Sequence, residues 1–137
     1  MKYLAIDYGT KRVGIATSDD GGRMAFPFSV IPNTSNLVEV VAVLCAKERI
    51  EAIVMGDSIN YQNQPNPIMK IVHPFAAALG ERTRLPVHFI NEVLSSQEAA
   101  HIQGDNAQND ASAAAIILQS YLNKWNPPTS REHDGEV

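Results

Sequence analysis

Five short apolar runs punctuate the chain, and the spacing between them changes once. The runs occupy residues 3–6, 13–17, 24–31, 52–55 and 87–90. Short turn-rich segments separate the first three runs, whereas a helix-length segment precedes each of the last two. Antiparallel strands can be joined by tight turns, but parallel strands need a long crossover, usually a helix. The sequence therefore predicts an α/β fold whose central, mixed five-stranded sheet combines an antiparallel meander with parallel strands and is flanked by helices.

Four helices are predicted around this sheet, over residues 36–49, 67–82, 95–104 and 110–124. Asn36 is expected to cap the first helix, and Pro74 is expected to bend or split the second. The third apolar run contains Pro27, which indicates an edge strand because proline cannot donate to the ladder. The inward-facing positions predicted for the first two helices are Leu37, Val40, Val41, Leu44, Ile68, Ile71, Val72, Phe75 and Leu79.

Length and charge limit the protein classes that remain. A chain of 137 residues can bury a core of its own, and we expect one domain over residues 1–125. The polar segment 126–137 is predicted to be disordered. A net charge of -4 excludes a nucleic-acid-coating protein that is basic throughout, although it permits a local basic site. The longest apolar run, residues 40–46, is too short to span a bilayer, so no membrane partner is expected.

We expect no secretory signal at the N-terminus, because Asp7 interrupts the first apolar run, and the chain contains a single cysteine, Cys45. Cys45 lies among Val and Leu, so we expect a small buried hydrophobic residue. Both features fit a cytoplasmic protein.

Three carboxylates fall at special positions of the predicted fold. Asp7 ends the first strand, Glu92 follows the last strand, and Asp110 opens the final helix. The three residues can meet at one end of the sheet, where oxygen ligands suit Mg²⁺ or Mn²⁺. Each acid also has an ordinary structural explanation: Asp110 alone is typical of helix capping, and Glu92 alone is typical of a surface residue. Asp110 shares its helical face with residues predicted to pack on the sheet, namely Ala113, Ala114, Ile117 and Tyr121.

The segment Asp7 to Asp19, which reads DYGTKRVGIATSD, resembles the first motif of the YqgF family of RuvX-like Holliday junction resolvases. Further blocks resemble that family in order and at compatible spacing, so the resemblance covers residues 1–124. These blocks are Val54-Met55-Gly56, Asn91-Glu92-Val93-Leu94-Ser95, Asp110-Ala111-Ser112-Ala113-Ala114 and Leu118-Gln119-Ser120-Tyr121-Leu122. The resemblance implies a ribonuclease H-like fold.

The resemblance implies that Asp7, Glu92 and Asp110 are catalytic acids that bind Mg²⁺ or Mn²⁺. Lys11 and Arg12 would lie beside them as phosphate contacts, a role that suits cations next to a metal site.

The implied substrate-binding set also includes Gly9, Gly56 and Asn91. Gly9 is expected to permit the turn after Asp7, and Gly14 and Gly56 to allow the close approach of chain or substrate.

The chain departs from the family pattern at three positions and in one segment. Asn91 stands where the family has Asp, Val93 where it has Arg, and Ser58 where it has Pro. Residues 104–109 lack the basic side chains usual before the last helix. Valine cannot replace the ionic contact of arginine, so binding to nucleic acid is expected to be weaker or supplied by a partner.

The resemblance implies a metal-dependent nuclease that matures the 5′ end of the 16S ribosomal RNA precursor, with Holliday-junction cleavage as an alternative. The implied partners are nucleic acid and ribosomal particles, and the protein would be a monomer or a weak homodimer. A second hypothesis is a catalytically weakened relative that binds RNA or the ribosome. The segment Asp7-Tyr8-Gly9-Thr10 also resembles the first phosphate loop of actin-like ATPases and sugar kinases, which close two such domains around a nucleotide.

Overall fold

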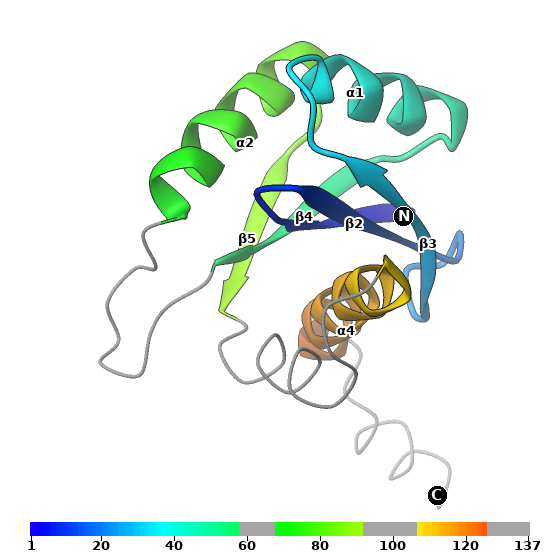
Figure 1. Ribbon diagram of the computed structural model, residues 1–137. Coiled ribbons are helices and arrows are strands. Elements are labelled where there is room, and N and C mark those ends of the chain that lie inside the picture. Colours follow the sequence, from blue (N-terminus) through cyan, green and yellow to red (C-terminus); the bar gives the residue numbers. More distant parts are fainter. Residues whose placement is uncertain (58–67, 92–106, 126–137) are drawn as a thin grey trace, which may run out of the picture.

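The computed structural model describes residues 1–57, 68–91 and 107–125. In chain order, its elements are β1 (Tyr3–Tyr8), β2 (Arg12–Ser18), β3 (Ala25–Pro32), α1 (Leu37–Lys47), β4 (Ala52–Asp57), α2 (Met69–Thr83), β5 (Val87–Asn91) and α4 (Ala107–Trp125). Figure 1 shows the sheet as a central layer, with α1 and α2 on one face and α4 on the other. The helix predicted over residues 95–104 and the tail predicted to be disordered lie outside the described residues.

The sheet is mixed, as the spacing of the apolar runs predicts. Its strand order is β3-β2-β1-β4-β5. The first three strands form an antiparallel meander, and β1, β4 and β5 run parallel to one another. Pro27 lies in β3 at the edge of the sheet, which confirms the predicted edge position. The carboxyl ends of the three parallel strands therefore lie together at one end of the sheet, where β1 reaches Asp7.

Side chains alternate along β1 between two separate cores. Leu4 and Ile6 belong to the core beneath α1 and α2, whereas Ala5 belongs to the core beneath α4. This alternation follows from the two-residue period of a strand. The larger core also contains Val13, Ile15, Leu37, Val41, Cys45, Ile50, Ile53, Met55, Met69, Val72, Phe75, Ala76 and Leu79. Cys45 is buried, which confirms its expected place in the core.

The first helix differs from the prediction at two positions. Asn36 is the N-cap residue of α1, but its side chain makes no capping hydrogen bond and instead accepts one from Thr34 Oγ1. Val40 is 38% exposed, so its predicted inward position is wrong. The buried stripe of α1 runs through Leu37, Val41 and Cys45, and Val40 lies one residue, or about 100°, away from Val41 around the helix.

The second helix continues through Pro74, so the predicted split does not occur. Pro74 removes one backbone donor, but both Pro74 and Lys70, whose carbonyl would have accepted that bond, lie on the exposed side of α2. Ile71 is 51% exposed, which makes its predicted inward position wrong, whereas Val72, Phe75 and Leu79 are buried as predicted.

The last helix begins at Ala107, three residues before the predicted start. Asp110 therefore lies in the first turn of α4, so the alternative explanation of Asp110 as a helix cap does not hold. The predicted inward stripe is confirmed, because Ala113, Ala114, Ile117 and Tyr121 are all buried. Within the described ranges, no helix combines the length and the apolar character needed to cross a membrane.

Candidate active site

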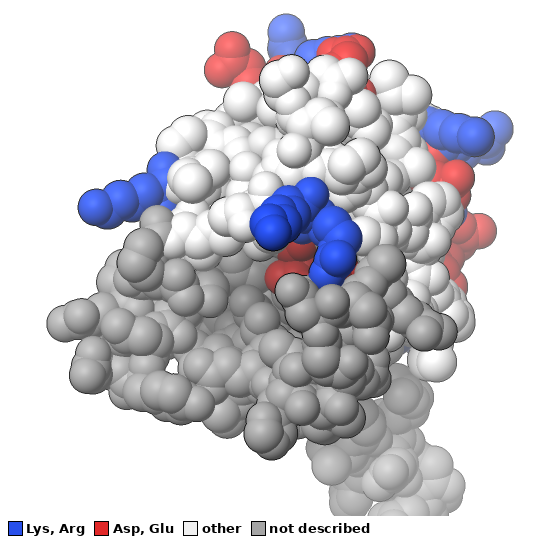
Figure 2. All heavy atoms as spheres, in the orientation of Figure 1, with Lys and Arg blue, Asp and Glu red and all other residues white. Residues whose placement is uncertain are grey.

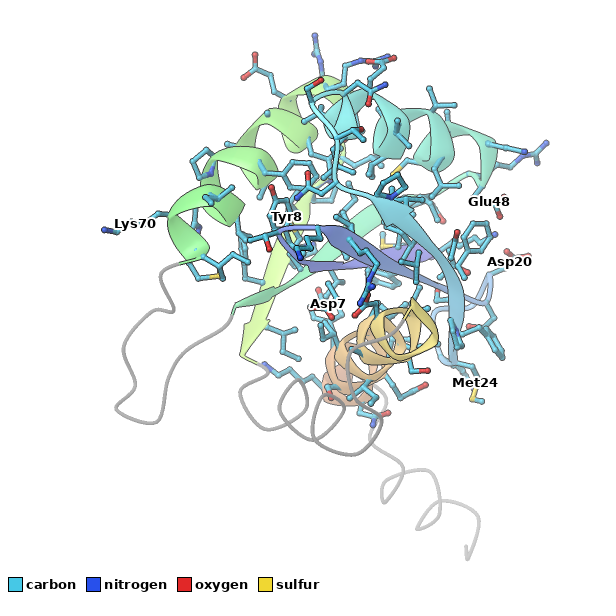
Figure 3. The ribbon with its side chains drawn as sticks, viewed as in Figure 1. Asp7, Tyr8, Asp20, Met24, Glu48 and Lys70 are labelled. Carbon is cyan, nitrogen blue, oxygen red and sulfur yellow. The ribbon has the colours of Figure 1, made fainter. Side chains whose placement is uncertain are left out.

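Asp7 lies near the end of β1, on the face of the sheet that α4 covers. The alternation along β1 places Asp7 on the same face as the buried Ala5. In the antiparallel ladder Asp7 pairs with Gly14 of β2, so these two residues are direct neighbours across the strands. Figure 3 shows Asp7 between the sheet and α4. A carboxylate in this position is partly shielded from water on both sides.

Gly14 brings the start of α4 against the sheet. A β-carbon at Gly14 would collide with the backbone carbonyl of Asp110 and would lie only 3.2 Å from the amide nitrogen of Ala111. Only glycine can occupy this position without moving the helix. The predicted close approach at Gly14 is therefore confirmed, and the approaching segment is the backbone of Asp110. Because Gly14 is the cross-strand partner of Asp7, the same contact brings the two acids together.

Asp7 is sensitive to its surroundings electrostatically. Burial, followed by the negative charge of Asp110, raises the pKa of Asp7 from its ordinary 3.8 to about 7. Burial disfavours the charged form of a carboxyl group, and so does a neighbouring like charge. At neutral pH the site therefore holds an acid that is poised between its two protonation states and would be stabilised as an anion by a nearby cation.

Arg12 pairs with the second acid, Asp110. Its Nε donates a 2.7 Å hydrogen bond to Oδ2 of Asp110, and the two side chains form a partly buried ion pair. The sequence predicted Arg12 as a phosphate contact but did not predict this pairing. The signal was available in the strand period, since Arg12 and Gly14 are two residues apart in β2 and so lie on the same face of the sheet.

A cavity of about 370 Å³ opens beside this ion pair. It is lined by Gly9, Thr10, Lys11, Arg12 and Asp110, four of which form the segment from the β1–β2 turn into β2. In Figure 2, Lys and Arg side chains lie directly over Asp or Glu atoms in the middle of the displayed face. Gly9 is required here for space, because a β-carbon on it would collide with the carbonyl of Arg12. This explains how Gly9 permits the predicted turn.

The remaining predicted site residues fall near the same edge of the sheet. The parallel β1–β4 ladder pairs Ile6 with Met55, so Asp7 and Gly56 are the next residues along the two strands. Gly56 is opposite Ile90, and the backbone of Asn91 is opposite Asp57. Glu92 follows Asn91 and lies outside the described residues, so its predicted place among the acids remains a prediction.

The described part of the site fits a divalent cation of the hard, oxygen-preferring kind. Its donor groups are the carboxylates of Asp7 and Asp110, and carboxylate oxygens are the ligands that Mg²⁺ and Mn²⁺ prefer. Within residues 1–57, 68–91 and 107–125, no cluster of three or more His, Cys, Asp or Glu side chains is placed to hold a metal ion. Two acids and an arginine are therefore the described core of the candidate site.

Comparison with known proteins shows a consistent family relationship. A family model described as "RuvX: Holliday junction resolvase" matches residues 1–124. The chain is 43% identical over 134 residues to a protein of Nitratidesulfovibrio vulgaris, covering 90% of this chain and 94% of that protein. It is 36% identical over 136 residues to a protein of Maridesulfovibrio salexigens, covering 89% of this chain and 98% of the relative. Both relatives are named as candidate pre-16S rRNA nucleases.

Solved structures show the same fold at low sequence identity. RuvC of Thermus thermophilus, solved in complex with a Holliday junction substrate, matches with a TM-score of 0.62 at 15% identity, covering 93% of this chain and 96% of that chain. The fowlpox virus resolvase, solved with Holliday junction DNA, matches with a TM-score of 0.58 at 14% identity, covering 91% and 99%. These likenesses confirm the predicted ribonuclease H-like architecture.

Proposed function

Because this chain belongs to the RuvX family of Holliday junction resolvases, a family of nucleases, we propose that it matures the 5′ end of the 16S ribosomal RNA precursor. The protein is a hydrolase that acts on phosphodiester bonds. The observation that carries the proposed site is the contact between Gly14 and the backbone of Asp110, which places two acids side by side next to a basic turn. Relatives up to 43% identical that carry the pre-16S rRNA nuclease name support RNA as the substrate.

In the proposed mechanism, Asp7 and Asp110 hold a divalent ion, Mg²⁺ or Mn²⁺, with Glu92 as the third acid. When bound, such an ion stabilises the charge that develops on the attacking and leaving oxygens of a phosphodiester. The chain's own contribution is to place Asp7 and Asp110 side by side. Because the pKa of Asp7 is about 7, its proton must leave before the carboxylate can hold a cation, so occupation of the site would depend on pH near neutrality.

Lys11 and Arg12 bind the phosphate groups of the substrate in this proposal. Lys11 is exposed at the mouth of the cavity, and Arg12 is held at Asp110 by its Nε. An arginine that contacts a site carboxylate is fixed in direction, so it can orient a phosphate next to the acids. Gly9 and Gly56 keep the backbone close to the substrate, and Asn91 stands at the end of β5 near it.

The proposed partners are nucleic acid, and ribosomal particles that carry the precursor, which places the work in the cytoplasm. A single cut at one end of an RNA requires one site, so we propose that a monomer or a weak homodimer suffices. A symmetric cut of a four-way DNA junction would instead require a two-fold dimer. The family description favours this second candidate function, the resolution of branched DNA, strongly enough to include it in the test.

The test compares cleavage of a labelled 16S precursor RNA and a four-way DNA junction, with and without Mn²⁺. The wild type is compared with Asp110→Asn and with a matched control, Asp20→Asn, which changes an exposed acid in the β2–β3 turn. We expect Mn²⁺-dependent cleavage of the RNA by the wild type and the control, and none by Asp110→Asn.

Cleavage of the junction alone would replace RNA maturation by the resolvase function. If the folded wild type binds the RNA but cuts neither substrate, the protein is a binding relative that has lost catalysis, and Asn91 and Val93 become the residues to revert. Full activity of Asp110→Asn would refute the proposed site.

A further inference from the structure

The basic turn that lines the candidate site is held from outside by Asn33. Nδ2 of Asn33 donates a 2.8 Å hydrogen bond to the carbonyl oxygen of Gly9, and its backbone N–H donates a 3.0 Å bond to the carbonyl oxygen of Lys11. Asn33 is half-buried and directly follows β3, 24 positions along the chain from Gly9. Asn33 thus forms hydrogen bonds with both ends of the turn, at Gly9 and at Lys11.

The turn needs such support because it extends beyond the sheet. The last β1–β2 pair is Tyr8 with Val13, so residues 9–11 lie past the end of that ladder. On the other side, the β2–β3 ladder ends at the pair of Arg12 with Pro32. Asn33 is the next residue after Pro32 and continues β3 toward the turn. Within the described part of the chain, Asn33 is the one side chain that hydrogen-bonds to residues 9–11.

We propose that Asn33 is a positioning residue of the nuclease, which fixes the Gly9–Lys11 turn so that Lys11 and Arg12 meet the phosphates of the substrate. The inference rests on the proposed phosphate-binding role of these two side chains. In the described part of the chain, the hydrogen bonds of Asn33 go to Gly9 and Lys11 and not to Asp7 or Asp110. Asn33 acts by removing the freedom of a turn whose side chains must otherwise be ordered when the substrate binds, at a cost in affinity.

The chemistry at position 33 requires a short side chain with an N–H donor. Leucine has nearly the same shape as asparagine but no donor, so Asn33→Leu removes the bond to Gly9 without adding a charge. The backbone bond to Lys11 remains in this variant, which limits the change to one contact. Asn36→Leu is the matched control, because Asn36 is exposed, lies three residues further on and makes no capping bond to α1.

The experiment measures binding of precursor RNA in Ca²⁺ buffer at several salt concentrations, together with kcat and KM in Mn²⁺. For Asn33→Leu we expect affinity to fall about five- to tenfold through KM rather than kcat. The slope of log Kd against log salt concentration should decrease by about 1, which corresponds to the loss of about one phosphate contact. The Mn²⁺-induced shift of the melting temperature should be unchanged, because Asn33 forms no hydrogen bond with Asp7 or Asp110 among the described residues. Asn36→Leu should behave as the wild type in every assay.

A double-mutant cycle with Lys11→Ala separates positioning from general structural support. If Asn33 acts through the turn, Asn33→Leu should cost little further affinity once Lys11 has been removed. Fully additive effects, or wild-type binding by Asn33→Leu when Lys11→Ala is weak, would overturn the role of Asn33 alone. Unchanged binding by Lys11→Ala would overturn the phosphate role of the turn, and the proposal for Asn33 with it.

Discussion

The two faces of the sheet differ in the size of the side chains that they present to the helices. Beneath α1 and α2 the strands present large aliphatic side chains such as Leu4, Ile6 and Ile53, which keep the helix backbones away from the sheet. Beneath α4 the strands present small residues, including Ala5, Gly14 and Ala16, and the helix backbone reaches the sheet at Gly14. Among the described residues, the first arrangement buries the larger set of apolar side chains, and the second places polar groups of the helix against a strand.

Charge follows the same division. On the α4 face, Asp7, Arg12 and Asp110 meet in a partly buried cluster between helix and sheet. On the other side, the bridge between Glu39 of α1 and Arg82 of α2 lies on the outer surface of the helices, with both side chains about half exposed. The comparison teaches that both faces carry a buried core, whereas the described charged site lies on the α4 face alone, and the next variants test that division.

Gly14→Ala should have the largest effect, because it damages both properties of the α4 face. The added methyl group collides with backbone, which cannot rotate away, so α4 must shift. We expect a loss of about 3 kcal/mol in the free energy of unfolding and no measurable cleavage. Denaturant unfolding and the RNA assay check this. Gly21→Ala is the control, since a β-carbon there would meet only Asp19 Oδ2 at 3.8 Å. Equal behaviour of the two variants would contradict the close approach.

Asp7→Asn should abolish cleavage and yet stabilise the fold at alkaline pH. The folded-state pKa of about 7 lies above the ordinary 3.8, so the folded wild type binds more protons than the unfolded chain between these values. The free energy of unfolding of the wild type therefore falls by at most about 4 kcal/mol as the pH rises from about 4 to 7, and it levels off above pH 7. The Asp7→Asn variant should not show this decrease, because asparagine does not titrate.

Thermal unfolding of wild type and Asp7→Asn between pH 4 and pH 8, in the presence of a chelator, checks the pH effect. The two proteins should be similar at pH 4, and the variant should melt higher at pH 8. Asp20→Asn should follow the wild type at every pH. A variant that melts lower than the wild type at pH 8 would show that Asp7 stabilises the fold as an anion.

Ile53→Ala and Ile117→Ala compare the two cores directly, because both side chains are fully buried on opposite faces. Each should lose about 2–5 kcal/mol of unfolding free energy. Well below the unfolding temperature, Ile53→Ala should retain kcat, whereas Ile117→Ala should lower it because α4 carries Asp110. Denaturant unfolding and initial cleavage rates at low temperature measure both quantities. Equal losses of activity would break the division between the faces.

Arg82→Ala should have the smallest effect. The bond between Arg82 and Glu39 is bidentate, at 2.9 and 2.8 Å, but both groups are open to solvent, where ion pairs contribute little. We expect an unchanged unfolding midpoint and unchanged cleavage, and Glu39→Ala should match it. A clear drop in the midpoint for both variants would show that the outer surface of α1 and α2 contributes to stability beyond the core.

The sequence was a good guide to the strands and a weaker guide to the helix faces. The change in spacing between apolar runs predicted the mixed sheet, and Pro27 predicted its edge, because both depend on local backbone rules. The helical spacing of apolar residues predicts inward positions for Val40 and Ile71, because each lies three or four residues from other apolar residues, yet both are exposed. In an apolar-rich helix several stripes satisfy the same period, and only the position of the opposing sheet selects one of them.

The candidate site was predicted in part. Its two described acids were chosen from strand and helix ends, and the structure brings Asp7 and Asp110 together across Gly14. The sequence predicted neither the hydrogen bond from Arg12 to Asp110 nor the hydrogen bonds from Asn33 to the turn. Each of these hydrogen bonds requires a side chain to point toward a residue far away in the sequence. The direction of a side chain at the end of a strand depends on tertiary packing, which no local sequence pattern encodes. Glu92 stays a prediction.

The contact between Arg12 and Asp110 spans 98 positions of the chain, which has a consequence for biosynthesis. During translation, the five strands emerge from the ribosome before α4 does, so a growing chain carries Asp7 and the basic turn without their partner acid. The proposed nuclease centre is completed only when the last helix has left the exit tunnel and docked.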